Sequence, residues 1–174
     1  METTINKLTE YETQFFNKLS NYLDTKLYFY GSIQRADYFP KSSDIDVDIF
    51  VENEKNAIQK IQHFLNIEKS EFRKIIYSLH KTNKVVYGYK VKYEDVRHNF
   101  TTELSIYNEK YKKDILLEHN YKTFLPSYIT FLLYILKSLY YNLKILPTPF
   151  YNYIKKIIIN VLVEGKDCEF VTIS

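Results

Sequence analysis

The sequence predicts a mixed α/β (α+β) domain in which a small mixed β-sheet packs against flanking helices. A short aromatic strand at 26–30 ends at a glycine, and a second strand at 44–51 alternates strictly between carboxylate and apolar residues. An amphipathic helix at 55–67 follows. Two further strands, at 85–93 and 100–107, are separated by a polar loop and are expected to form a hairpin. Strands interleaved with helices in this order indicate a sheet with helices packed on it.

Helices are also expected at both ends of the chain. Apolar residues at helical spacing after Thr3 or Thr4 predict a first helix at about 4–23. A single helical turn is expected at 32–36, directly after the aromatic strand. Residues 71–81 fit either a helix or a strand, and the pattern there does not decide between them.

The C-terminal third is expected to be mainly helical. Helices are predicted at about 126–143 and 149–163, with Pro147 and Pro149 marking the break between them. The first of these is apolar nearly all round, so it is expected to be buried. The tail at 167–174 is a candidate edge strand.

Length and composition are those of a soluble globular chain. Its 174 residues suit one compact unit, which we divide into a core at 1–110 and a C-terminal helical segment at 111–174 packed on that core. Hydrophobic residues make up 45% and charged residues 26%, which excludes a disordered chain. The net charge of +3 is too small to argue by itself for a polynucleotide partner.

Composition also bears on location. The single cysteine, Cys168, excludes an internal disulfide and a Cys-based zinc site, which favours an intracellular, cytoplasmic setting, in a host cell if the chain is viral. The polar N-terminus lacks the apolar core of a signal peptide. The uncharged stretch at 123–136 is too short to span a bilayer, so no membrane association is expected.

The strand at 44–51 carries an acidic row. Because side chains at i and i+2 of a strand share a face, Asp44, Asp46 and Asp48 lie on one side and apolar residues on the other. Carboxylates this close raise each other's pKa, so the row favours a bound cation. Hard carboxylate oxygens suit Mg²⁺ or Mn²⁺, and two of them can bridge a pair of metals about 3.5–4 Å apart. The alternative is a solvated strand face.

The glycine before this strand points to phosphate binding. Gly31 and Ser32 lie at a strand-to-helix turn, where backbone N–H groups and a hydroxyl can meet phosphate oxygens. A lone Gly-Ser pair is weak evidence. Its place between two strands, just before the acidic row, predicts a joint phosphate and metal site. Lys41 and Arg73 are further candidates for phosphate contact.

This stretch resembles the signature of the DNA polymerase β-like nucleotidyltransferase superfamily, in its small, minimal form. The resemblance is carried by Tyr30-Gly31-Ser32, Arg35 and Ser43-Asp44-Ile45-Asp46-Val47. The chain departs from the common pattern at Gln34 and Ala36, which are variable positions. The motif covers about 27–51, and the order of elements fits the first 110 residues.

The resemblance implies a sheet of the nucleotidyltransferase type and assigns roles to particular residues. Gly31, Ser32 and Arg35 would bind a nucleoside triphosphate (NTP). Asp44 and Asp46 would bind two Mg²⁺ (or Mn²⁺) ions, and a third carboxylate is expected from a later strand. Glu103 is the best candidate, as metal ligand and as proton acceptor. The rivals are Glu94 and Asp95, at the loop end of the preceding strand, whereas Asp48 is expected to orient a ligand or to pair with a cation.

The expected activity is transfer of a nucleoside monophosphate from an NTP to a hydroxyl acceptor, with release of pyrophosphate. The acceptor is a nucleic-acid end, a protein or a small molecule. With only three glycines, the chain lacks a Gly-rich DNA-binding motif, which weighs against a templated polymerase. The alternative is a non-catalytic or partner-dependent member: a nucleotide sensor, a regulatory subunit or a toxin–antitoxin-type subunit. The four histidines show no ligand spacing and are expected to be structural or exposed.

Overall fold

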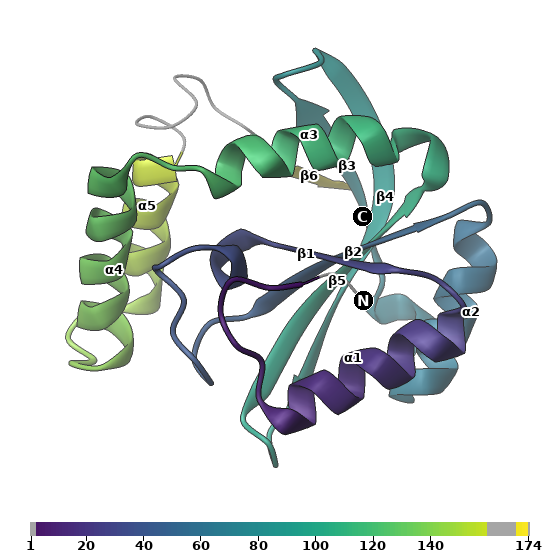
Figure 1. Ribbon diagram of the computed structural model, residues 1–174, viewed down its shortest axis with the longest axis horizontal. Coiled ribbons are helices and arrows are strands. Elements are labelled where there is room, and N and C mark those ends of the chain that lie inside the picture. Colours follow the sequence, from purple (N-terminus) through teal and green to yellow (C-terminus); the bar gives the residue numbers. More distant parts are fainter. Residues whose placement is uncertain (1–2, 160–169, 174) are drawn as a thin grey trace.

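A computed structural model describes residues 3–159 and 170–173 of the chain. It contains a mixed sheet with the strand order β1-β2-β5-β4-β3-β6 (Figure 1). Strands β2 and β5 are parallel, and every other neighbouring pair is antiparallel. The strands are β1 (Leu27–Tyr30), β2 (Ile45–Val51), β3 (Arg73–Leu79), β4 (Lys84–Asp95), β5 (Phe100–Asn108) and β6 (Phe170–Ile173).

Helices cover both faces of the sheet and extend beyond one side of it (Figure 1). The α-helices are α1 (Glu10–Leu23), α2 (Glu54–Leu65), α3 (Lys112–Thr123), α4 (Ser127–Tyr141) and α5 (Thr148–Ile159). Short 3₁₀ turns are η1 (Gly31–Gln34), η2 (Lys69–Glu71) and η3 (Glu109–Tyr111). Of the helices in these described ranges, none is long and apolar enough to cross a membrane.

The main core lies between the sheet and helices α1 and α2. The apolar row of β2 faces this side together with inward residues of β1, β5 and both helices. Fully buried members include Phe16, Leu19, Ile45, Val47 and Leu104. The apolar half of the alternating β2 pattern therefore anchors the strand, and its acidic half must face the opposite side.

The opposite face is covered in part by α3. Ile115 of this helix packs on a second core that includes Phe50, Tyr77 and Tyr107. Gly88 makes room for the Tyr107 ring, because a Cβ at this position would come within 2.5 Å of it. Helix α3 thus covers Asp48 of the acidic row, whereas Asp44 and Asp46 stay partly exposed.

The register of the parallel pair sets the polar face. Asp46 of β2 lies directly opposite Glu103 of β5, and Glu103 lies opposite Lys92 of β4. Thr102 fixes this register, since its buried hydroxyl donates to the Ile45 carbonyl oxygen at 2.8 Å. Directly opposed residues share a face, so one carboxylate from each parallel strand stands in a single row.

Helices α4 and α5 form a hairpin at one side of the sheet (left in Figure 1). They pack on each other through a small third core. Its buried members are Ile129, Leu133, Leu136, Tyr151 and Ile158.

The predicted first helix begins later than expected. Its cap is Thr9 and not Thr3 or Thr4: the Thr9 hydroxyl accepts from the Glu12 amide, and the Glu12 carboxylate accepts from the Thr9 amide. The preceding residues instead run along the η1 turn, where the Asn6 side chain donates to the backbone oxygens of Ile33 and Arg35. Ile5 and Leu8 have helical spacing in the sequence, but they belong to a non-helical segment that packs along the η1 turn.

Two expectations for the later chain are corrected. Helix α3 was not expected from the sequence. Helix α4 was expected to be buried, but Tyr128 and Phe131 are 61% and 63% exposed, because only one stripe of the helix packs on α5.

The ambiguous segment at 71–81 is a strand, and the predicted hairpin and tail strand are confirmed. The predicted end of the last helix at 160–163 lies outside the described residues, as does Cys168.

Candidate functional site

The turn after β1 requires a glycine for two reasons. Gly31 has a φ of +72°, in the left-handed region that favours glycine. A Cβ at this position would also overlap the carboxylate of Asp46. The backbone of the turn therefore packs directly against the Asp46 carboxylate, with no room for a side chain between them. Ser32, the next residue, is buried in the same turn.

Asp46 is the most strongly perturbed carboxylate of the row. Burial raises its pKa to about 6, and the nearby charges of Glu103 and Asp44 add to the rise, while Lys90 and Lys155 oppose it. The ionised form of Asp46 is therefore destabilised mainly by loss of solvent and in part by its acidic neighbours. Such a place favours a bound cation.

Two lysines of β4 pair with the other carboxylates of the row. The Nζ atom of Lys92 lies 3.1 Å from Asp44, and that of Lys90 lies 3.2 Å from Glu103. In the described part of the chain, no three His, Cys, Asp or Glu side chains are already arranged around one metal position. The donor set nevertheless fits Mg²⁺, because Asp44, Asp46 and Glu103 supply hard oxygens from neighbouring positions on one face.

Asp48 has a different environment from the rest of the row. It is fully buried, and its carboxylate lies 2.8 Å from Nε2 of His119 on α3. The His119 ring stacks on Tyr30, with centroids 4.0 Å apart. Asp48 thus lies against the His119 imidazole beneath the open site, where the two would form an ion pair if the ring is protonated.

The rival carboxylates lie toward the end of β4, and neither is opposite Asp46. Asp95 accepts a hydrogen bond from the Tyr11 hydroxyl at 2.5 Å and contacts His98 at 2.8 Å, at the end of the β4–β5 hairpin. These two contacts lower the pKa of Asp95 to about 2. Glu94 is exposed near the same end. Of the three candidates for the third carboxylate, the fold places Glu103 opposite Asp46.

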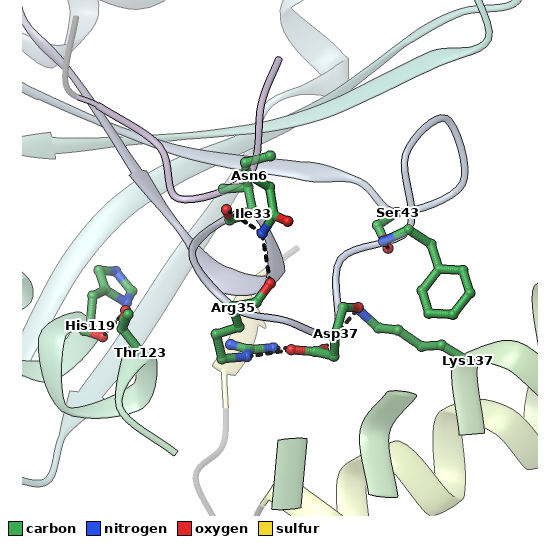
Figure 2. Close-up of polar contacts among 9 residues, drawn as sticks. Asn6, Ile33, Arg35, Asp37, Ser43, His119, Thr123 and Lys137 are labelled. Atoms are coloured by element: carbon green, nitrogen blue, oxygen red, sulfur yellow. Dashed lines mark hydrogen bonds and ion pairs between the residues drawn. The ribbon is translucent and has the colours of Figure 1, made fainter. Parts of the chain in front are cut away.

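Arg35 is held by a neighbour that the sequence did not single out. Its guanidinium makes a two-pronged contact with Asp37, at 2.8 and 3.2 Å (Figure 2). Lys137 of α4 reaches the same residue from the other side, 3.0 Å from the carboxylate and 2.8 Å from the backbone oxygen. We call Arg35, Asp37 and Lys137 the clasp.

The clasp is buried, and the pKa values of two of its members, Asp37 and Lys137, are shifted. Burial by itself raises the pKa of Asp37, but the bonds and charges of Arg35 and Lys137 bring it below its usual range. Burial lowers the pKa of Lys137 to about 8, although Asp37 attracts its charge. No sequence signal marks Asp37 and Lys137 as partners, because 100 positions separate them.

A cleft of about 210 Å³ lies between the glycine turn and the C-terminal helices. Gly31, Ser32, Arg35 and Asp46 line one side of it. The lysines that line it from the helices are Lys122, Lys137 and Lys155. The cleft therefore combines backbone and hydroxyl donors, a carboxylate and several cations, which is the mixture that a metal-bound polyphosphate requires.

The predicted nucleotide-binding residues thus line one cleft together with Asp46. Glu103 lies opposite Asp46, and Asp44, just before β2, contacts Lys92 on the same face. The helix lysines were missed, since lysines on a helix are ordinarily a solvated face.

Residues 13–123 match the sequence model of a family described as a nucleotidyltransferase domain. The match spans more than half of the chain and includes the glycine turn, the acidic row and Glu103. No curated protein and no solved structure matches the chain.

Proposed function

Because the chain belongs to the nucleotidyltransferase domain family, we propose that it transfers a nucleoside monophosphate from an NTP to a hydroxyl acceptor in a metal-dependent reaction. The observation that carries this proposal is the packing of the Asp46 carboxylate against Gly31. It brings a hard metal ligand and a phosphate-binding turn into contact at the wall of a cationic cleft.

Asp44, Asp46 and Glu103 would hold two Mg²⁺ ions, which when bound offset the charge of the triphosphate and activate the attacking hydroxyl. The Gly31–Ser32 turn donates hydrogen bonds to phosphate oxygens. Lys122 and Lys155 line the same cleft and attract the triphosphate chain. The clasp joins α4 to the loop after the turn, and α5, which carries Lys155, packs on α4.

The transfer itself is a displacement at phosphorus. The acceptor oxygen forms a bond to the α-phosphorus of the NTP while the bond from that phosphorus to the bridging α–β oxygen breaks. Pyrophosphate leaves with the electron pair of the broken bond. The proton of the acceptor hydroxyl passes to the Glu103 carboxylate, which acts as general base.

The test is binding of the four NTPs, measured by thermal shift with and without Mg²⁺ or Mn²⁺. A ligand at 100 times its dissociation constant adds roughly 2.7 kcal/mol to the free energy of unfolding. We expect a metal-dependent shift for wild type that is lost in Asp44→Ala and kept in the control Glu94→Ala, whose carboxylate lies at the end of β4. No shift with any NTP in wild type would contradict the proposal.

The second candidate is a non-catalytic nucleotide-binding member. The observation in its favour is that Lys92 and Lys90 already supply counter-charges to Asp44 and Glu103. In that case NTP would bind equally well without a divalent metal, and labelled NTP would release no pyrophosphate. The metal dependence of the thermal shift therefore separates the two candidates.

A further inference from the structure

A second groove opens beside the acidic row, on the side away from the NTP cleft. It measures about 450 Å³ and lies over β3, β4 and the η2 turn. Arg73, Lys90 and Lys92 supply its positive charge, and Glu71 and Glu103 its negative charge. We call it the basic groove.

The basic groove and the acidic row occupy the same sheet face. Lys92 lies opposite Glu103, and Lys90 lies opposite both Ser105 of β5 and Arg73 of β3. Directly opposed residues share a face, so charge along this face changes from negative on β2 and β5 to positive on β4 and β3. The overall net charge of +3 gives no sign of this division.

Glu103 marks the boundary between the two regions. It lines the basic groove, whereas Asp46 lines the NTP cleft. The two residues are nevertheless directly opposite each other on adjacent strands. A group placed in the basic groove would therefore reach the carboxylate that accepts a proton in the proposed reaction, and it would approach the NTP from the other side of Asp46.

We propose that the basic groove binds the acceptor, and that the acceptor carries a phosphate group near its reacting hydroxyl. This inference rests on the proposed transfer reaction and narrows its acceptor class. The shared chemistry is a phosphate next to a hydroxyl, as at the 3′ end of a nucleic-acid strand or in a phosphorylated small molecule. The three cations of the groove attract an anionic acceptor and would repel a cationic one.

The lysine pairs are consistent with this role. Lys92 is 56% exposed even while it contacts Asp44, so its ammonium remains open to an anion from the groove.

Arg73 gives the cleanest test, because β3 lies one strand farther than β4 from Asp46 and Glu103. The probe is a short fluorescent single-stranded oligonucleotide with a free 3′ hydroxyl, as DNA and as RNA, titrated with the full chain and followed by anisotropy. The variant is Arg73→Gln. The matched control is Lys74→Gln, an exposed neighbour on the same strand whose side chain points to the other face.

We expect Arg73→Gln to weaken oligonucleotide binding roughly tenfold at low salt and to lower the salt-dependence slope by about 0.7. Lys74→Gln should match wild type, and both variants should keep the NTP thermal shift. A nucleoside 5′-monophosphate is the competing probe. Displacement of the oligonucleotide at equal concentration would identify a small phosphorylated acceptor, and its failure would identify a nucleic-acid end.

Three results would overturn the inference: binding of neither probe, binding that Arg73→Gln leaves unchanged, or binding that Lys74→Gln weakens to the same extent. If NTP still gives its metal-dependent shift in that event, only the acceptor class is wrong. Loss of the NTP shift in wild type would instead refute the transfer reaction, and the anisotropy would still report directly on the groove.

Discussion

Lys137 of α4 donates a hydrogen bond to the backbone oxygen of Asp37 at 2.8 Å and lies 3.0 Å from the carboxylate of the same residue. Both side chains are almost completely buried. The contact joins the helical hairpin to the loop that follows the glycine turn. Since the NTP cleft takes lining residues from both parts, this one lysine helps to set the distance between the cleft walls.

Replacement of Lys137 by methionine should therefore be costly. Asp37 would keep Arg35 but lose its second buried cation, and we expect the free energy of unfolding to fall by about 3 kcal/mol. Urea unfolding at neutral pH measures this loss. Lys156→Met is the control, because Lys156 is exposed on α5. Equal stability of the two variants would show that the contact of Lys137 with Asp37 contributes nothing to the fold.

Asp46→Asn should stabilise the protein while removing metal-dependent NTP binding. Burial and the neighbouring carboxylates raise the pKa of Asp46 to about 6 in the folded chain, above its value of 3.8 in the unfolded chain. The protonated form is thus favoured in the fold, and this contribution is complete below pH 4 and lost as the pH rises through 6.

At pH 7 the ionised Asp46 carboxylate consequently costs the fold roughly 1–3 kcal/mol. The asparagine variant should gain about this amount at pH 7 and much less at pH 4, as measured by urea unfolding at both values. A variant less stable than wild type at pH 7 would contradict the predicted cost of the ionised Asp46 carboxylate.

Gly31→Ala should impair both folding and ligand binding. The positive φ costs an alanine roughly 1–2 kcal/mol, and its Cβ must displace the Asp46 carboxylate. Gly88→Ala is the matched control, because its Cβ would meet Tyr107 in the second core, away from the cleft. We expect both to lower the melting temperature, and only Gly31→Ala to abolish the NTP shift.

Glu103→Gln should separate binding from chemistry. The amide keeps the shape of the side chain but cannot accept the proton, so the transfer rate should fall by at least about a hundredfold. Pyrophosphate release from labelled NTP measures this rate. Glu94→Gln should retain the wild-type rate. The reverse ranking of the two variants would move the general base to the end of β4.

The sequence was most informative where a local pattern is repeated. Strict alternation predicted β2 and its two faces, and the glycine turn and acidic row carried the family resemblance. Strand pairing could only be guessed, because the register of β2 with β5 depends on contacts between residues 57 positions apart. Glu103 was a good candidate since it sits in the middle of a strand pattern.

The C-terminal third was harder to predict, for a physical reason. Helix α3 has no clear apolar stripe, because its buried face combines Ile115 with the polar residues Glu118 and His119. Helix α4 is apolar on every side, yet among the described residues it packs only on α5 and on the loop that contains Asp37 and Phe39, so Tyr128 and Phe131 stay exposed. Its pattern therefore predicted burial that the neighbouring elements do not supply.

The hydroxyl of Thr102 has a consequence beyond the single bond that it makes with Ile45. A slip of β5 by one residue against β2 would break this bond and turn Glu103 into the apolar core beneath the sheet. Misregistered molecules would then lack activity while retaining nearly all of their secondary structure. For this protein, enzymatic activity would be a stricter measure of correct refolding than circular dichroism.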